Sequence, residues 1–330
     1  MSKLKVLLIG ASGTVGREAF TELFIKKRDY EISLLLRDSR KNRKMFNPFR
    51  KDINIFWGDI RHYDVVEKAV SSQDIVIHVA AVLPDISLKK PQSAFDTNLG
   101  GTKNIVNAML NQSTRPSLIY TSSVAVYGDR LKNPIIKISD PIEENSHDVY
   151  TNTKIEAEKL IQNSGLKYCI FRLTYVVATN VLKFRRIMFY MPLKTSIEII
   201  HAKDSGLALV NAIGSNRIWG KTFNLSGGKN CQIIYEDHLN DILDIMGFGR
   251  NFLPKIAFAE KDFHSGFFDL METQKTQELL NFQRYTLEDF YSEVKDWIGI
   301  RRFFIPLVKP IIRWFILRKS KFYRINKKYK

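Results

Sequence analysis

Apolar runs and helix-like patterns alternate along the first 175 residues of the chain. Runs such as "DIVIHVAAV" are apolar at nearly every position, which is typical of a parallel strand covered on both faces. The pattern predicts strands at 4–9, 31–36, 53–57, 74–79, 117–121 and 167–172, and helices at 14–27, 63–71, 92–112 and 149–163. This order predicts an α/β fold, a doubly wound parallel sheet with helices on both sides.

The pattern is less regular after residue 175, and aromatic and basic residues mix over 180–200. A strand is expected at 222–225 and helices near 235–246 and 286–298. We therefore expect a sheet domain over 1–175 with a returning segment near 200–225, a smaller substrate-binding domain mainly over 176–300, and a tail over 301–330.

Composition adds a charged tail to this picture. The 330 residues are 45% hydrophobic, enough for a sizeable core, and carry a net charge of +17. Eleven Lys and Arg residues and no Asp or Glu lie in 301–330, so the rest of the chain carries only +6 (17 − 11). Cys169 and Cys231 offer neither a disulfide framework nor a metal-ligand spacing. No signal peptide or long uncharged apolar stretch is recognisable, so a cytoplasmic location is expected.

Three glycines, Gly10, Gly13 and Gly16, separate the first strand from the first helix in "LLIGASGTVGREAF". Glycine lets the backbone approach a pyrophosphate, and a helix N-terminus offers free N–H groups to it. The spacing differs by one residue from the G-x-G-x-x-G fingerprint. Taken alone, the stretch fits either a nucleotide cradle or a tight turn.

The second strand ends in Arg37, about 20 residues beyond the glycines, and a basic run follows in "LLLRDSRKNRK". An acidic residue at this strand end binds the ribose hydroxyls of NAD, whereas an Arg accommodates the 2′-phosphate of NADP. Arg37 therefore favours NADP over NAD, while the neighbouring Asp38 leaves NAD open. A solvated basic loop is the alternative interpretation.

A serine, a tyrosine and a lysine form the candidate catalytic set. Tyr150 and Lys154 are four residues apart in a helical pattern and share one face. A nearby ammonium favours the phenolate, and such a tyrosine can exchange a proton with a substrate hydroxyl or carbonyl. Ser123, at a strand end in "TSSVAVYG", can hydrogen-bond the same oxygen. An ordinary helix-surface pair and an ordinary strand end are the alternatives.

Together these residues resemble the extended short-chain dehydrogenase/reductase superfamily, which includes nucleotide-sugar epimerases and dehydratases, dihydroflavonol reductases and 3β-hydroxysteroid dehydrogenases. The resemblance covers about residues 4–228 in order: G-x-x-G-x-x-G, then "WGDI", "HVAA", "TNLGGTKNI", "SSVAVYG" and Y-x-x-x-K. It implies a Rossmann-type sheet and a set of cofactor-binding residues: Gly10, Ser12, Gly13, Thr14, Val15, Gly16, Arg37, Asp59, Ile60, Ala80, Ala81, Asn98, Tyr150 and Lys154.

The resemblance also implies roles. Tyr150 would be the general acid/base, Lys154 would lower its pKa and bind the nicotinamide ribose, and Ser123 would polarise the substrate oxygen. We expect an NAD(P)-dependent oxidoreductase acting on a hydroxyl or carbonyl carbon of a small substrate. A nucleotide-sugar epimerase with tightly bound NAD is the alternative, and a non-catalytic dinucleotide sensor or scaffold is another, which the intact triad argues against.

Some positions depart from the family pattern. Leu173 stands where a proline is common, and "MPLKTSIEII" lacks the glycines that often precede a diphosphate-binding Arg. Lys183, Arg185, Arg186 or Lys194 could bind a nucleotide-sugar diphosphate, although no motif places them. Val124 and Ala125 replace the acidic residue that dehydratases carry after the serine, which argues against dehydration.

Structural roles are expected for the remaining polar residues of interest. His78 borders the cofactor cleft as a packing residue, and Asp204, in "HAKDSGLAL", matches a structural position of the family's second domain. His201 and His264 show no arrangement that indicates chemistry, and no metal site is expected.

The tail "IRRFFIPLVKPIIRWFILRKSKFYRINKKYK" lies outside the resemblance. A helix would align Arg302, Lys309 and Arg313 on one face, with apolar and aromatic residues elsewhere, while Pro306 and Pro310 count against an unbroken helix. The tail fits a peripheral contact with the inner surface of an anionic membrane, or a helix packed on the second domain with a frayed end. A nucleic-acid partner is not expected, and a homodimer is a further option.

Overall fold

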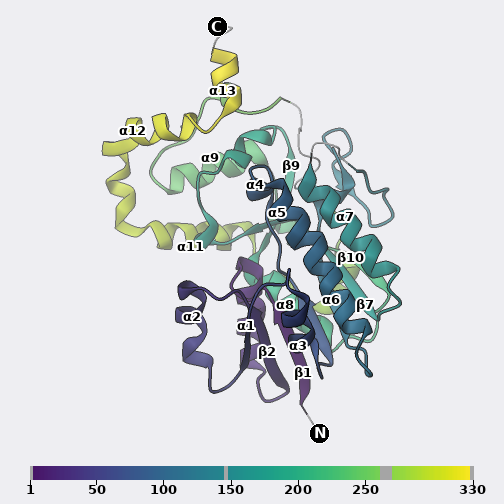
Figure 1. Ribbon diagram of the computed structural model, residues 1–330. Coiled ribbons are helices and arrows are strands. Elements are labelled where there is room, and N and C mark those ends of the chain that lie inside the picture. The colour runs from purple at the N-terminus through teal and green to yellow at the C-terminus, as the bar shows by residue number, and fades with distance from the viewer. Residues whose placement is uncertain (1–2, 145–147, 261–269, 328–330) are drawn as a thin grey trace.

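The computed structural model describes residues 3–144, 148–260 and 270–327, and its central feature is a seven-stranded parallel sheet (Figure 1). The strands lie in the order β10-β7-β5-β4-β1-β2-β3. They are β1 Leu4–Ile9, β2 Tyr30–Leu36, β3 Asn54–Trp57, β4 Ile75–His78, β5 Ser117–Ser123, β7 Tyr168–Leu173 and β10 Lys221–Leu225. The direction of strand addition reverses between β1 and β4, where open α/β sheets bind ligands.

Alternate residues of β1 face two separate cores. Val6 and Leu8 pack with helices α1 (Thr14–Ile25) and α8 (Ala202–Ile213) on one side of the sheet. Leu7 and Ile9 pack on the other side with α3 (Tyr63–Val70), α6 (Gly101–Leu110) and α7 (Val149–Gln162). All four β1 side chains are completely buried, as expected for a strand between two helix layers. The predicted Rossmann-type doubly wound sheet is confirmed.

Two helical segments differ from the sequence prediction. The single helix expected over 92–112 is divided into α5 (Pro91–Ala94), a π-helical turn (Phe95–Gly100) and α6. Helix α2 (Arg40–Phe46) forms in the basic run after β2, where no helix was expected. The Ser39 hydroxyl caps α2 by accepting a hydrogen bond from the Asn42 backbone N–H, at 3.1 Å.

The second half of the chain builds a smaller mixed sheet beside the carboxyl ends of the large one. Its strands are β8 (Tyr175–Val177), β9 (Ser196–His201) and β11 (Gln232–Ile234), with β9 parallel to β8 and antiparallel to β11. Beside it, β6 (Ile135–Ile136) and β12 (Leu270–Met271) form a separate two-stranded parallel pair, and β12 contacts β9. Helices α9 (Tyr235–Ile245), α11 (Leu287–Ile298), α12 (Ile305–Leu317) and α13 (Lys321–Asn326) share a core with this sheet. Helix α10 (Gln274–Leu280) packs on α8 and β10 of the large sheet, and α4 (Pro84–Ser87) precedes α5 in the first half of the chain.

A buried ion pair fastens α7 to the sheet. The Arg172 guanidinium on β7 donates to both carboxylate oxygens of Glu158 on α7, with the shortest distance at 2.6 Å. Arg172 also donates to the Tyr127 hydroxyl, which in turn donates to Asn224 on β10. This network fixes the helix that carries Tyr150 and Lys154 against two strands.

We predict that Glu158→Gln lowers the free energy of unfolding by about 3–5 kcal/mol, because it leaves the buried guanidinium without a counter-charge. Urea denaturation measures the change. Glu156→Gln on the same helix is the control, since Glu156 pairs with Lys159 at the surface and should cost no more than about 1 kcal/mol. Equal effects of the two substitutions would contradict the assigned role of the buried pair.

Candidate cofactor and catalytic site

The glycine loop between β1 and α1 is closed by backbone contacts that leave no room for side chains. A Cβ atom on Gly16 would lie 2.1 Å from the Gly10 carbonyl oxygen. Gly10 has a φ of +101°, and a Cβ there would lie 2.7 Å from the Ala80 backbone nitrogen. The loop therefore brings the N-terminus of α1 directly over the ends of β1 and β4, in the geometry that accepts a pyrophosphate.

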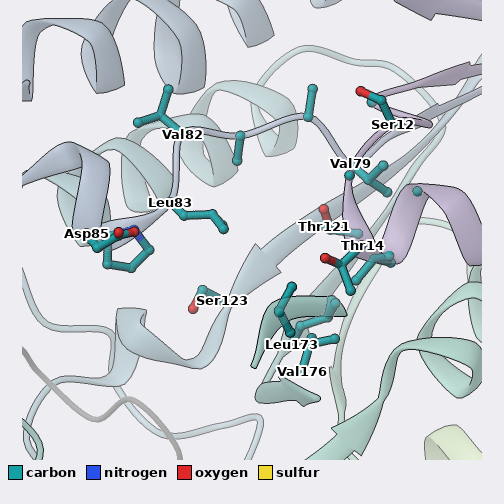
Figure 2. Close-up of a pocket in the computed structure, with 18 of the residues that line it drawn as sticks. Ser12, Thr14, Val79, Val82, Leu83, Asp85, Thr121, Ser123, Leu173 and Val176 are labelled. Atoms are coloured by element: carbon teal, nitrogen blue, oxygen red, sulfur yellow. The ribbon is translucent and has the colours of Figure 1, made fainter. Parts of the chain in front are cut away.

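A cleft of about 910 Å³ runs from this loop across the carboxyl ends of the strands. Figure 2 shows Ser12 and Thr14 of the loop at one side of it, Ser123 at the end of β5, and Asp85 farther along. Most of the residues predicted to bind the cofactor line the cleft: Gly10, Ser12, Gly13, Thr14, Val15, Gly16, Arg37, Asp59, Ile60, Ala80, Ala81, Tyr150 and Lys154. This size and the glycine cradle fit a dinucleotide.

Asn98 is the exception among the predicted cofactor residues. Its side chain is buried behind the cleft wall, where it accepts from the Val82 backbone N–H at 2.7 Å and donates to the Val82 carbonyl at 3.1 Å. It also donates to the Thr153 hydroxyl on α7. Asn98 thus shapes the wall of the cleft, and its contact with the cofactor stays a prediction.

Beyond the end of β2, exposed basic groups line the cleft around two carboxylates, and each carboxylate is paired with an arginine. Arg43 binds both oxygens of Asp38, at 2.6 and 2.7 Å, and these hydrogen bonds hold the pKa of Asp38 below its usual value. Burial would raise the pKa of Asp59, but hydrogen bonds from Arg61 outweigh it and lower that pKa. Arg37 is exposed at the lining of the cleft.

The candidate catalytic hydroxyls meet where β5 ends beside the first turn of α7. Ser123 is the last residue of β5; its hydroxyl accepts a hydrogen bond from the Ala125 backbone N–H at 3.2 Å, and its polar side chain favours a lower pKa of the nearby Tyr150 phenol. Burial raises the pKa of Tyr150 to about 12, even though the Ser123 side chain opposes the shift. The phenol is therefore protonated at neutral pH.

Lys154 lies one turn further along α7 and is completely enclosed. Its ammonium donates to the Thr121 carbonyl at 2.8 Å and to the Tyr120 hydroxyl at 3.1 Å. Burial lowers the pKa of Lys154 to about 7, while the Glu158 carboxylate opposes that shift. The expectation that Lys154 lowers the pKa of Tyr150 is not met, because burial of the phenol dominates and the ammonium binds β5 instead.

The opposite end of the cleft is formed by the second half of the chain and is mainly apolar. It is lined by Tyr175, Val177, Leu182, Ile187, Met188, Met191, Tyr235, Ile242 and Phe290. Its basic groups are Lys183 and Arg185, and Arg185 is paired with Asp85 at 3.2 Å. Arg186 and Lys194, the other basic candidates from the sequence, do not line the cleft.

Sequence reasoning missed most of this end, including His238 on α9. The His238 ring is buried between Tyr175 and Phe290 and hydrogen-bonds the Tyr291 hydroxyl at 3.0 Å. Burial lowers the pKa of His238 to about 3, so the imidazole is neutral. The residues that line this end come from β8, the 182–191 stretch, α9 and α11, and no local motif marks any of them.

The other polar residues have structural surroundings. Asp204 accepts from the backbone N–H groups of Arg284 and Tyr285, both at 3.1 Å, which supports its expected structural role. His78 is buried against Thr102, and burial lowers its pKa to about 3. His201 pairs with Glu293 at 3.1 Å, away from the cleft. His264 lies outside the described residues.

Comparison with known proteins identifies the family. Residues 7–169 match the model of the 3-beta hydroxysteroid dehydrogenase/isomerase family. A UDP-glucose 4-epimerase of Lactobacillus helveticus is 32% identical over 177 residues, 51% of this chain and 51% of that protein. A 3 beta-hydroxysteroid dehydrogenase/Delta 5→4-isomerase of Mycobacterium tuberculosis is 26% identical over 232 residues, 66% of this chain and 58% of that protein. The chain thus spans little more than half the length of these relatives.

Solved structures show the same fold across most of the chain. UDP-glucuronic acid 4-epimerase from Bacillus cereus, with UDP-glucuronic acid and NAD, gives a TM-score of 0.70 at 18% identity, covering 89% of this chain and 100% of that one. A dTDP-glucose 4,6-dehydratase from Bacillus anthracis, with NAD, gives 0.69 at 17% identity, covering 89% and 96%. From its glycine loop, its sheet and these matches, the chain belongs to the extended short-chain dehydrogenase/reductase superfamily of NAD(P)-dependent dehydrogenases and epimerases.

Proposed function

We propose that this chain is an NADP(H)-using oxidoreductase that interconverts a hydroxyl and a carbonyl group on a small, largely apolar substrate. The observation that carries the proposal is the meeting of Ser123, Tyr150 and Lys154 in the cleft that begins at the glycine loop. A protein that only senses or stores a dinucleotide has no need of this set.

The protonation state of the site suits reduction of a carbonyl at neutral pH. When bound, the dinucleotide supplies the hydride. The protonated Tyr150 phenol donates a proton to the developing alkoxide oxygen, and the Ser123 hydroxyl hydrogen-bonds the same oxygen. Lys154 positions the end of β5 through the Thr121 carbonyl and adds a nearby positive charge when protonated.

The lining of the substrate end favours an apolar body with one polar group. Aromatic and aliphatic side chains dominate it, and Asp85 neutralises one of its two basic residues. A nucleotide diphosphate carries two or more negative charges, which Lys183 alone would have to balance. A nucleotide-sugar epimerase remains the second candidate, since Lys183 and Arg185 do line the cleft and the Lactobacillus relative is named for that activity.

The preference for NADP follows from the groups at the end of β2. Asp38, the carboxylate that would bind the ribose hydroxyls of NAD, is occupied by Arg43. Arg37 lines the cleft beside it, together with Lys41, and both are exposed. This arrangement supports binding of a 2′-phosphate.

We predict that Tyr150→Phe lowers turnover at least about 100-fold, because the proton donor is lost, while NADPH affinity changes little. NADPH consumption with a panel of cyclic and aryl ketones measures turnover, and fluorescence titration measures affinity. Tyr30→Phe, a half-buried tyrosine at the start of β2, is the matched control and should leave both unchanged. Unchanged turnover in Tyr150→Phe would refute the mechanism.

The buried lysine predicts a pH-dependent stability. Between its ordinary pKa of 10.5 and its folded pKa of about 7, the unfolded chain holds a proton that the folded chain does not. The stability of the wild type therefore falls as the pH falls through this window. Lys154→Met removes this titration. Lowering the pH from about 9.5 to about 7 should therefore reduce the free energy of unfolding of the wild type by roughly 2–3 kcal/mol more than that of Lys154→Met.

Urea denaturation at the two pH values measures this difference. Lys159→Met, at the surface of the same helix, is the control, because Lys159 is exposed and bonds Glu144 and Glu156. A constant stability difference between wild type and Lys154→Met would contradict the shifted pKa.

For the cofactor, we predict that Arg37→Gln weakens NADPH binding about 10-fold or more, because the 2′-phosphate loses its guanidinium partner. NADH has no 2′-phosphate, so its binding should be nearly unchanged. Fluorescence titration with both cofactors measures the ratio. Arg28→Gln, an exposed arginine between α1 and β2, is the control. Mass spectrometry of the cofactor released from purified protein gives an independent readout, and retained NAD would favour the epimerase instead.

A further inference from the structure

The tail forms a helix against the second half of the chain, despite its two prolines. Pro306 stands in the first turn of α12, where a missing N–H costs nothing, and the helix continues through Pro310. Ile312 and Ile316 pack into the core that also holds Phe248 and Phe252. Lys309 points toward that core, over the Phe252 ring, and Arg302 precedes the helix. The single basic face expected from the sequence is therefore corrected.

The outward side of α12 is apolar and uncovered. Leu307, Ile311 and Trp314 follow one another at helical spacing and are 78%, 60% and 54% exposed. Other exposed apolar side chains of the tail are Phe303, Phe304, Val308, Phe315 and Ile325. We call Leu307, Ile311 and Trp314 the tail apolar face. In Figure 1 the yellow helix α12 lies at the edge of the molecule, at the end opposite the N-terminus.

Basic groups border the tail apolar face. Arg313, Arg318 and Arg324 are exposed, and within the described part of the chain none of the three forms an ion pair with a carboxylate. The Arg318 guanidinium lies 4.5 Å from the Trp314 ring centroid. The 301–330 segment has no acidic residue at all. Apolar side chains flanked by cations of the same segment match a surface that is apolar inside and anionic outside.

We propose that the tail apolar face binds the surface of an anionic lipid bilayer, with its aromatic and aliphatic side chains inserted among the lipids and its arginines on the headgroups. A second copy of the chain is a poorer occupant, because a symmetric contact would bring the two arginine-rich rims together. No described helix is long and apolar enough to cross a membrane, and α12, at 13 residues, measures about 20 Å. The contact is therefore peripheral.

The face is held in place before it meets a membrane. Lys319 donates to the Phe184 carbonyl at 2.7 Å, and Ser320 donates to the Ala257 carbonyl at 2.5 Å. Asn326 on α13 donates to the Ile256 carbonyl at 3.0 Å. These bonds fix α12 and α13 to the second half of the chain, so bilayer binding requires no folding of the tail.

The test is sedimentation of the full-length protein with vesicles of phosphatidylcholine containing phosphatidylglycerol, and with vesicles of phosphatidylcholine alone. We expect at least 10-fold stronger binding to the anionic vesicles, weakened by salt. Leu307→Gln combined with Ile311→Gln should reduce that binding at least 10-fold, and Arg313→Gln combined with Arg318→Gln should reduce the preference for anionic lipid.

The matched control is Leu4→Gln combined with Ile25→Gln, two exposed apolar residues at the start of β1 and the end of α1, which should leave vesicle binding unchanged. Thermal unfolding confirms that each variant is folded. Equal binding by the control and the Leu307/Ile311 variant would overturn the proposal. So would a dimer in sedimentation velocity without lipid that the Leu307/Ile311 variant abolishes, because the face would then be covered by a second copy.

Discussion

The close approach of backbone at the glycine loop is the constraint on which the cleft depends. Gly16 can start α1 against the Gly10 carbonyl only because neither residue carries a side chain. Gly10 in turn lies against Ala80 at the end of β4, so the loop closes the gap where strand order reverses. The candidate site residues lie along the same edge of the sheet as this loop, because the carboxyl ends of all the parallel strands meet there.

Burial, rather than charge pairing, sets the resting state of the candidate catalytic residues. It raises the pKa of the Tyr150 phenol and lowers that of the Lys154 ammonium. Both shifts disfavour the charged form of the side chain, so the site carries little charge. A buried site with little charge strengthens any hydrogen bond to a charge that develops on the substrate oxygen. The Arg172–Glu158 pair keeps α7 close to the sheet, which makes this enclosure possible.

The sequence alone predicted the elements whose signal is local. Continuous apolar runs placed the strands of the large sheet, and the glycine spacing placed the loop. Helix α2 was missed because its residues are mostly basic, although Ser39 before it is a cap signal. The substrate end could not be predicted, because Tyr175, Ile242 and Phe290 converge only through tertiary packing. The raised pKa of Tyr150 likewise depends on burial that no spacing reveals.

The tail and the substrate end of the cleft share one stretch of chain. Residues 182–191 contribute Leu182, Ile187 and Met188 to the cleft, while the Phe184 carbonyl of the same stretch accepts the bond from Lys319. The Phe184 ring also packs on Phe248, beside the loop that supports α12. A contact made by the outer side of α12 is therefore linked through short, packed steps to the apolar lining. This arrangement would place the end of the cleft that suits an apolar substrate next to the surface where such molecules dissolve.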